Sequence, residues 1–167
     1  MKKSLVSLGI VALLLSSCAN DEANTEERAQ NEWTNFIQKH LVGEWKPQSI
    51  TIKPLLGQAV VKKEYSSFGN SADVVVLNKD FTGVFQAYDS LGQAKTSPFI
   101  WYHKLEELGI QVADNRTLKT ILLHKSTNEL EVSIGLEQVA ADLIPFIPEV
   151  KEIKEKERYF VHFLFVK

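Results

Sequence analysis

The stretch 158-RYFVHFLFV-166 is apolar on both of its faces, and this pattern decides the fold class. Successive side chains of a β-strand point to opposite sides. A strand at the edge of a sheet would leave one of these apolar rows in water. We therefore expect a strand within a closed barrel, with its inner face on a cavity and its outer face under a helix. One face carries Tyr159, Val161, Phe163 and Phe165, and the other carries Phe160, His162, Leu164 and Val166.

The chain from Trp45 onward consists of short strand-like segments separated by turn signals. Breakers such as Ser90-Leu91-Gly92 and Asp114-Asn115 interrupt the apolar runs. Several short strands at near-regular spacing favour an antiparallel sandwich or barrel. The stretch 117–124 supports the barrel, because it also carries apolar residues on both faces. The expected strands are 45–53, 59–65, 73–78, 82–89, 98–104, 108–113, 117–125, 129–135 and 158–166.

A short amphipathic helix is expected before the first strand. In 31-NEWTNFIQKHLVG-43, Trp33, Phe36, Ile37 and Leu41 recur at helical spacing with polar residues between them. We expect this apolar stripe to pack on the chain's own domain, although it could also bind a partner.

The first twenty residues, MKKSLVSLGIVALLLSSCAN, have the layout of a bacterial signal peptide. Two lysines precede the apolar run Leu5–Leu15, which is shorter than the ~20 residues of a membrane-spanning helix. Leu15-Ser16-Ser17-Cys18 resembles the bacterial lipobox. The resemblance implies that the Cys18 thiol receives a diacylglyceryl group, that the chain is cut before Cys18, and that the new amine takes a fatty acyl chain such as palmitate. The alternative is an ordinary secretory signal with a chance cysteine.

Lipidation also explains why the chain has one cysteine, which could form no intrachain disulfide. We divide the chain into a signal peptide (1–17), a lipidated N-terminus with a flexible tether (18–31), and a barrel domain (32–167). Ala19 occupies the position where an aspartate marks many Gram-negative lipoproteins for the inner membrane, so we expect the outer membrane. Asp21-Glu22 resembles a surface-export signal of some lineages, and the leaflet stays open between the periplasmic side and the cell surface.

The charge of the mature chain argues against nucleic acid as a partner. Residues 1–17 contain two lysines and no acid, so their removal takes the formal net charge from −2 to −4. A nucleic-acid-binding protein needs a basic face. The remaining length suffices for one domain and one core.

The stretch 41-LVGEWKP-47, in which a short helix leads to Gly-x-Trp on the first strand, resembles the opening of lipocalins and bacterial lipocalin-like lipoproteins. Phe81-Thr82-Gly83 resembles the hairpin near their third strand, and Phe99-Ile100-Trp101 resembles the aromatic strand that follows it. The resemblance spans residues 36–166 and implies a mainly β, antiparallel, up-and-down barrel of eight strands. It also implies that Gly43 and Trp45 form the barrel floor.

In this family an arginine from a late strand lies over the tryptophan ring, a cation–π contact. The candidates in the mature chain are Arg116 and Arg158, because Arg28 comes too early.

Motifs for catalysis or metal binding are absent from the sequence. His103, His124 and His162 fall on expected strands, but no His-x-His or His-Glu-x-x-His spacing joins them. No Gly-x-Ser-x-Gly and no phosphate-binding glycine loop occurs either. We expect a protein that is not an enzyme and holds no metal or other cofactor.

The leading hypothesis is a membrane-anchored lipoprotein that binds a small apolar or amphipathic ligand, since an eight-stranded barrel can hold one. The alternative is a filled barrel that docks another envelope protein through its rim. An apolar molecule that co-purifies with the protein would favour the first hypothesis, and a fully packed interior with an exposed apolar rim would favour the second. The aromatic residues expected on the cavity wall are Phe85, Tyr88, Phe99, Trp101, Tyr102, Phe163 and Phe165.

Residues 136–157, LEQVAADLIPFIPEVKEIKEKE, separate the last two strands by more than a hairpin needs. Pro145 and Pro148 exclude a continuous helix or a central strand across the apolar part. We expect a long loop that folds back over the barrel and completes the core with its apolar residues. A lid or docking element at the barrel mouth is the alternative, because long connections are often functional.

Prediction for the anchor. Mass spectrometry of the membrane-extracted protein should find a mature chain that begins at an acylated Cys18, because all four residues of the lipobox-like stretch agree. Cys18→Ser should leave the chain unprocessed or release it from the membrane. An unmodified N-terminus at another residue would contradict the assignment.

Overall fold

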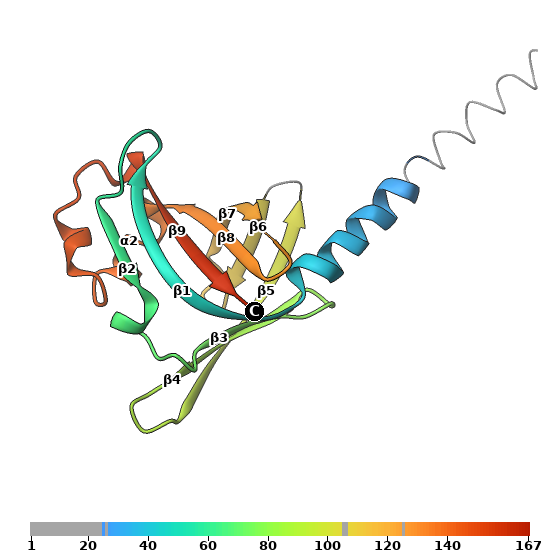
Figure 1. Ribbon diagram of the computed structural model, residues 1–167, viewed down its shortest axis with the longest axis horizontal. Helices are drawn as coiled ribbons and strands as arrows, with labels where there is room; N and C mark the ends of the chain where they lie inside the picture. Colours follow the sequence, from blue (N-terminus) through green and yellow to red (C-terminus); the bar gives the residue numbers. More distant parts are fainter. Residues whose placement is uncertain (1–24, 26, 105–106, 125) are drawn as a thin grey trace, which may run out of the picture. The chain divides into compact units, whose positions relative to one another are not determined.

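The computed structural model describes residues 25, 27–104, 107–124 and 126–167 (Figure 1). The chain divides into two units, residues 1–38 and 39–167. The predicted signal peptide and Cys18 lie outside the described residues. Within the described residues, no helix has the length and apolar character needed to cross a membrane.

The helix before the first strand is present but begins earlier than the sequence predicted. Residues 27–36 are helical and continue into the π-helical turn η1 (Ile37–Leu41). Residues 27–31 had been assigned to the flexible tether 18–31, whose other residues lie outside the described part apart from Thr25. The segment Glu27-Arg28-Ala29-Gln30 consists of good helix formers, which explains the early start.

Nine antiparallel strands form one continuous sheet in the described residues of the second unit (Figure 1). The pairing of β1 with β9 closes that sheet into a barrel. The bounds are β1 (Gly43–Pro54), β2 (Val61–Glu64), β3 (Val74–Leu77), β4 (Thr82–Tyr88), β5 (Ala94–Lys104), β6 (Glu107–Val112), β7 (Thr117–His124), β8 (Glu129–Gly135) and β9 (Tyr159–Val166).

β2 and β3 share one position in the barrel, so the nine strands fill eight positions. β2 pairs with Ser49–Ile52 of β1, and β3 pairs with Gly43–Trp45 of the same strand. The residues 65–73 between them, called the bridging segment below, include the 3₁₀ turn η2 (Tyr65–Ser67). The mainly β, closed, up-and-down barrel of eight strands predicted from the sequence is confirmed.

Of the predicted strand bounds, only those of β8 are reproduced at both ends. The other bounds differ by at most two residues, apart from the start of β5. β2 is shorter than the predicted 59–65 and ends before the bridging segment. β5 begins at Ala94 rather than at residue 98, and Pro98 lies within the strand opposite Val84.

The two faces of β9 separate as expected, but the outer face is not covered as expected. Val161 is fully buried, and Phe163 and Phe165 line the barrel interior. On the outer face His162 and Leu164 are half-buried and line a small groove with polar residues of β1, β2 and β8. Polar and charged side chains of the neighbouring strands, rather than a helix, therefore border His162 and Leu164.

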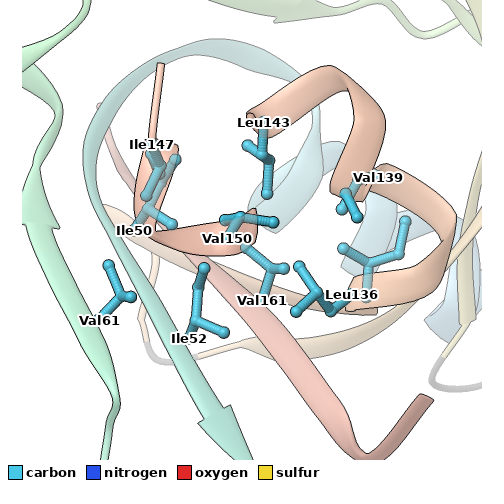
Figure 2. Close-up of a cluster of buried hydrophobic side chains, with 11 residues drawn as sticks. Ile50, Ile52, Val61, Leu136, Val139, Leu143, Ile147, Val150 and Val161 are labelled. Atoms are coloured by element: carbon cyan, nitrogen blue, oxygen red, sulfur yellow. The ribbon is translucent and has the colours of Figure 1, made fainter. Parts of the chain in front are cut away.

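Residues 136–157, called the plug segment below, close one end of the barrel. This end, where β1 ends and β9 begins, is called the mouth, and the opposite end is the floor. The segment forms α2 (Leu136–Leu143), η3 (Pro148–Lys151) and the start of η4 (Lys156–Arg158). The sequence did not predict α2; it ends before Pro145, and Pro148 starts η3. Figure 2 shows the cluster they build with the strands: Ile50, Ile52, Val61, Ile134, Leu136, Val139, Ala140, Leu143, Ile147, Val150 and Val161.

Prediction for the plug segment. Ile147 is fully buried in this cluster, whereas its neighbour Phe146 is 55 % exposed. Ile147→Ala should lower the free energy of unfolding by about 2–5 kcal/mol, as for other buried aliphatic truncations. Phe146→Ala is the matched control and should lower it by less than about 1 kcal/mol. Chemical denaturation measures both, and equal losses would contradict the assignment of the plug segment to the core.

Candidate functional site

The barrel encloses a cavity of about 320 Å³, called the inner cavity below. Every strand except β2 contributes to its wall, and Val139 of α2 contributes at the mouth end. A site that draws on so many elements exists only in the closed barrel. The lining residues are Trp45, Val75, Leu77, Phe85, Phe99, Leu108, Ile110, Val112, Leu118, Thr120, Leu130, Val132, Ile134, Val139, Phe163 and Phe165.

Strand alternation places these side chains inside. In β6, Leu108, Ile110 and Val112 line the inner cavity while Gln111 is exposed. Gly109 lies beneath the ring of Tyr102, and a Cβ at this position would lie 2.0 Å from that ring, so a larger residue would require the tyrosine side chain to move. Tyr102, which we expected on the cavity wall, therefore lies on the outer face and donates a hydrogen bond to Glu107.

The wall of the inner cavity is apolar. Its one polar side chain among the described residues, Thr120, is buried and donates its hydroxyl proton to the Leu108 carbonyl at 2.7 Å. The wall thus directs no unsatisfied polar atom of these residues inward. Cavities of this kind stay dry and take apolar molecules.

Trp45 closes the cavity at the floor. The side chain is fully buried, and its Nε1 donates to the Leu41 carbonyl at 2.7 Å, which ties β1 to the preceding turn. Gly43 enters the strand with φ of 135°, a conformation that glycine favours. Lys167 Nζ lies 4.7 Å from the centre of the Trp45 ring.

The cation over the tryptophan is therefore a lysine and not one of the two arginines expected. Arg116 is far from Trp45 in the topology, at the mouth between β6 and β7, and pairs with Asp114 and Asp142. Arg158 pairs with Glu155. The expectation failed because lysine can make the same contact from the end of β9, where no arginine is present.

The structure brings together four of the aromatic residues expected at the cavity, Phe85, Phe99, Phe163 and Phe165. Trp101 is buried below them but not in the wall; its Nε1 donates to the Thr82 carbonyl at 2.9 Å. Tyr88 lies at the mouth instead. The aliphatic wall residues were missed, although the alternation in 108-LGIQV-112 marked those of β6.

The histidines are dispersed over the barrel. His103 is buried, and this burial lowers the pKa of its imidazole. His162 lies on the outer face with its Nδ1 2.9 Å from Glu131 Oε1. The His124 side chain lies outside the described part. Among the residues that the structure describes, no group of three or more histidine, cysteine or acidic side chains could hold a metal ion.

A second hollow of about 730 Å³, called the mouth groove below, adjoins the inner cavity. Phe85 and Phe163 line both, so these two rings stand between them. The other lining residues are Ile50, Tyr65, Ser66, Phe68, Gly69, Asn70, Ser71, Asp73, Ala87, Tyr88, Ser90, Asp142, Leu143 and Phe146.

Asp73 holds the bridging segment against β4 and so shapes the mouth groove. It is 4 % exposed, and its Oδ1 accepts the Tyr88 backbone N–H at 2.7 Å. Its Oδ2 accepts the Tyr65 hydroxyl at 2.8 Å and the Asn70 N–H at 3.1 Å. Burial and the hydrogen bond to this carboxylate raise the pKa of Tyr65. Sequence reasoning missed this network, whose only sign was the turn-like 70-NSAD-73.

No protein-family model and no curated protein matches this chain. A solved structure of a protein from Bacteroides eggerthii is similar over 75 % of this chain and 98 % of its own, at 8 % identity and a TM-score of 0.45. Apocrustacyanin C2 is similar over 78 % of this chain and 62 % of its own, at 11 % identity and a TM-score of 0.44. Apocrustacyanin C1 has the same coverages, 14 % identity and a TM-score of 0.40. These likenesses are too weak to bear on function.

Prediction for the floor. Trp45→Ala should lower the free energy of unfolding by about 3–5 kcal/mol, because it removes a fully buried side chain and its hydrogen bond. Lys167→Ala should lower it by no more than about 1 kcal/mol, since an exposed cation–π contact contributes little. Denaturant unfolding of both variants measures the difference. A Trp45→Ala midpoint equal to that of the wild type would exclude a structural role at the floor.

Proposed function

We propose that this chain is a membrane-anchored lipoprotein that binds a small apolar or amphipathic ligand inside its barrel and catalyses no reaction. The observation that carries the proposal is the apolar inner cavity of about 320 Å³. Ligand pockets of proteins begin at about 300 Å³ and are mostly apolar, with a few polar groups that orient the ligand. Here the polar groups lie in the adjoining mouth groove.

The hollow interior separates this proposal from the alternative, a filled barrel that acts as an envelope interaction module. A filled barrel would bring its inward side chains into contact across the axis, at the density of a protein core. Around the inner cavity the side chains of β6 and β8 instead border a space on the order of ten water molecules in size.

The chemistry of the wall supports binding without catalysis. General acid–base catalysis needs a titratable group within hydrogen-bond reach of the ligand. The described side chains that line the inner cavity include no acid, base or thiol, and the Thr120 hydroxyl is engaged by the Leu108 carbonyl.

The lipid anchor at Cys18, in the outer membrane of a bacterial envelope, is the second part of the proposal. It rests on the signal-peptide layout and the lipobox-like stretch of the sequence. More than one acyl chain is needed for stable anchoring, and a triacylated Cys18 would satisfy that need. A binding protein held at a membrane is close to the phase in which apolar ligands collect.

Prediction for the inner cavity. Linear alcohols from hexanol upward should bind the full-length protein about fourfold more tightly for each added methylene, since burial of one methylene contributes about 0.8 kcal/mol to the binding free energy. The increase should stop when the chain fills the cavity. Calorimetric titration measures the series, and affinity independent of chain length would contradict the proposal.

A matched pair of variants on β6 locates the binding. Ile110→Trp places a large side chain in the inner cavity and should abolish the binding of the longer alcohols. Gln111→Trp places the same side chain on the exposed outer face and should leave binding unchanged. Thermal unfolding verifies that both variants fold.

A further inference from the structure

We propose that the mouth groove is a head-group site, in which an amphipathic ligand places an uncharged or positively charged head while its apolar chain fills the inner cavity. This inference rests on the proposed function and adds the chemical class of the ligand. Ligands with a negatively charged head should bind more weakly than those with an uncharged or positively charged head.

The two hollows are joined in a way that suits a ligand with two chemically different ends. Phe85 of β4 and Phe163 of β9 line both hollows, and both side chains are half-buried. The plug segment seals the rest of the mouth, because Leu136, Ile147 and Val150 are each fully buried. A chain that enters the inner cavity past these two rings leaves its other end in the mouth groove.

Aromatic side chains form one wall of the mouth groove. The rings of Tyr65 and Phe68 lie 5.0 Å apart, edge to face, and the ring of Phe146 lies 6.5 Å from Phe68. Phe146 is 55 % exposed although it is large and apolar. Aromatic faces attract cations and pack against uncharged groups, and their negative π-faces do not favour anions.

The charged side chains of the mouth groove are carboxylates. Asp73 and Asp142 line it, and the described lining residues include no lysine, arginine or histidine. Asp73 accepts its three hydrogen bonds from uncharged donors, so its charge is not neutralised by a cation within that network.

Asp142 contacts a cation, and the charge of this cation enters the net charge at the mouth groove. Arg116 Nη1 lies 2.9 Å from Asp142 Oδ2, and the same guanidinium binds Asp114. The three groups together carry a net charge of −1, and Asp73 adds another. A carboxylate or phosphate head would therefore meet net negative charge and no cationic donor in the lining.

Serine and asparagine side chains complete the site with polar groups. Ser66, Ser71 and Ser90 line the mouth groove, and Asn70 Nδ2 donates to the carbonyls of Tyr88 and Asp89 at its edge. Hydroxyl groups can both donate and accept, so they can bind the hydroxyl of an uncharged head or the N–H of an amine.

The test compares three ligands that share one chain and differ in the head: decanol, decylamine and decanoate. Each is titrated at neutral pH into the full-length protein in phosphatidylcholine nanodiscs, below the solubility limit of decanol and below the micelle concentrations of decylamine and decanoate. The Ile110→Trp variant in the same nanodiscs gives the background from partition into lipid. Decanol and decylamine should both bind about tenfold more tightly than decanoate, the difference expected for one nearby charge in a partly screened site.

Asp142→Asn tests the carboxylate that the head would approach most easily. It should tighten decanoate binding, weaken decylamine binding and leave decanol unchanged. Asp114→Asn is the matched control, because Asp114 binds the same Arg116 but does not line the mouth groove. It should change the relative affinities for the three ligands less than Asp142→Asn does.

The outcomes separate this inference from the proposed function. If the three ligands bind equally, or if decanoate binds more tightly than decanol or decylamine, the head-group site is overturned while ligand binding in the inner cavity stands. If no ligand exceeds the Ile110→Trp background, both are overturned. If Asp142→Asn and Asp114→Asn shift the order equally, the assignment to the mouth groove is wrong.

Discussion

The pairing of β1 with β9 is the interaction on which the rest of the structure depends. Eight residue pairs, from Lys46 opposite Val166 to Pro54 opposite Tyr159, join the first strand of the barrel to the last. Without them the sheet would have two open edges, and the inner cavity would have no wall on that side. The end of β9 also brings Lys167 over the ring of Trp45. Closure is therefore the condition for both stability and the inner cavity.

The sequence predicted closure because two-sided apolar strands are incompatible with an open sheet. From composition alone it also assigned four phenylalanines to the wall correctly, but it assigned Tyr88, Trp101 and Tyr102 there as well, and these do not line the inner cavity. It could not predict Lys167 over Trp45, because several cations could reach that ring and only the register of β9 selects one. α2 was missed because two nearby prolines dominate the pattern of the plug segment, although they lie beyond the end of the helix.

The mouth groove was beyond sequence reasoning for a different physical reason. It depends on contacts between segments that are remote in the sequence, such as the Asp73 carboxylate with Tyr88, or Phe68 with Phe146. The break between β2 and β3 creates it, because the bridging segment leaves the barrel wall where a continuous strand would have filled the space. An interrupted strand has the local pattern of weak β propensity, and nothing in its own residues indicates that the interruption borders a groove.

A void in the barrel has an energetic consequence that links stability to binding. Unfilled space among core side chains lowers stability, because the residues that border it lose packing contacts. The Trp45 contacts at the floor and the plug cluster at the mouth offset this loss, since both ends are packed while the middle is hollow. An apolar chain bound in the cavity would restore the missing contacts and would stabilise the folded state by mass action. Under the proposed function, the hollow middle thus links the stability of the barrel to the binding of its ligand.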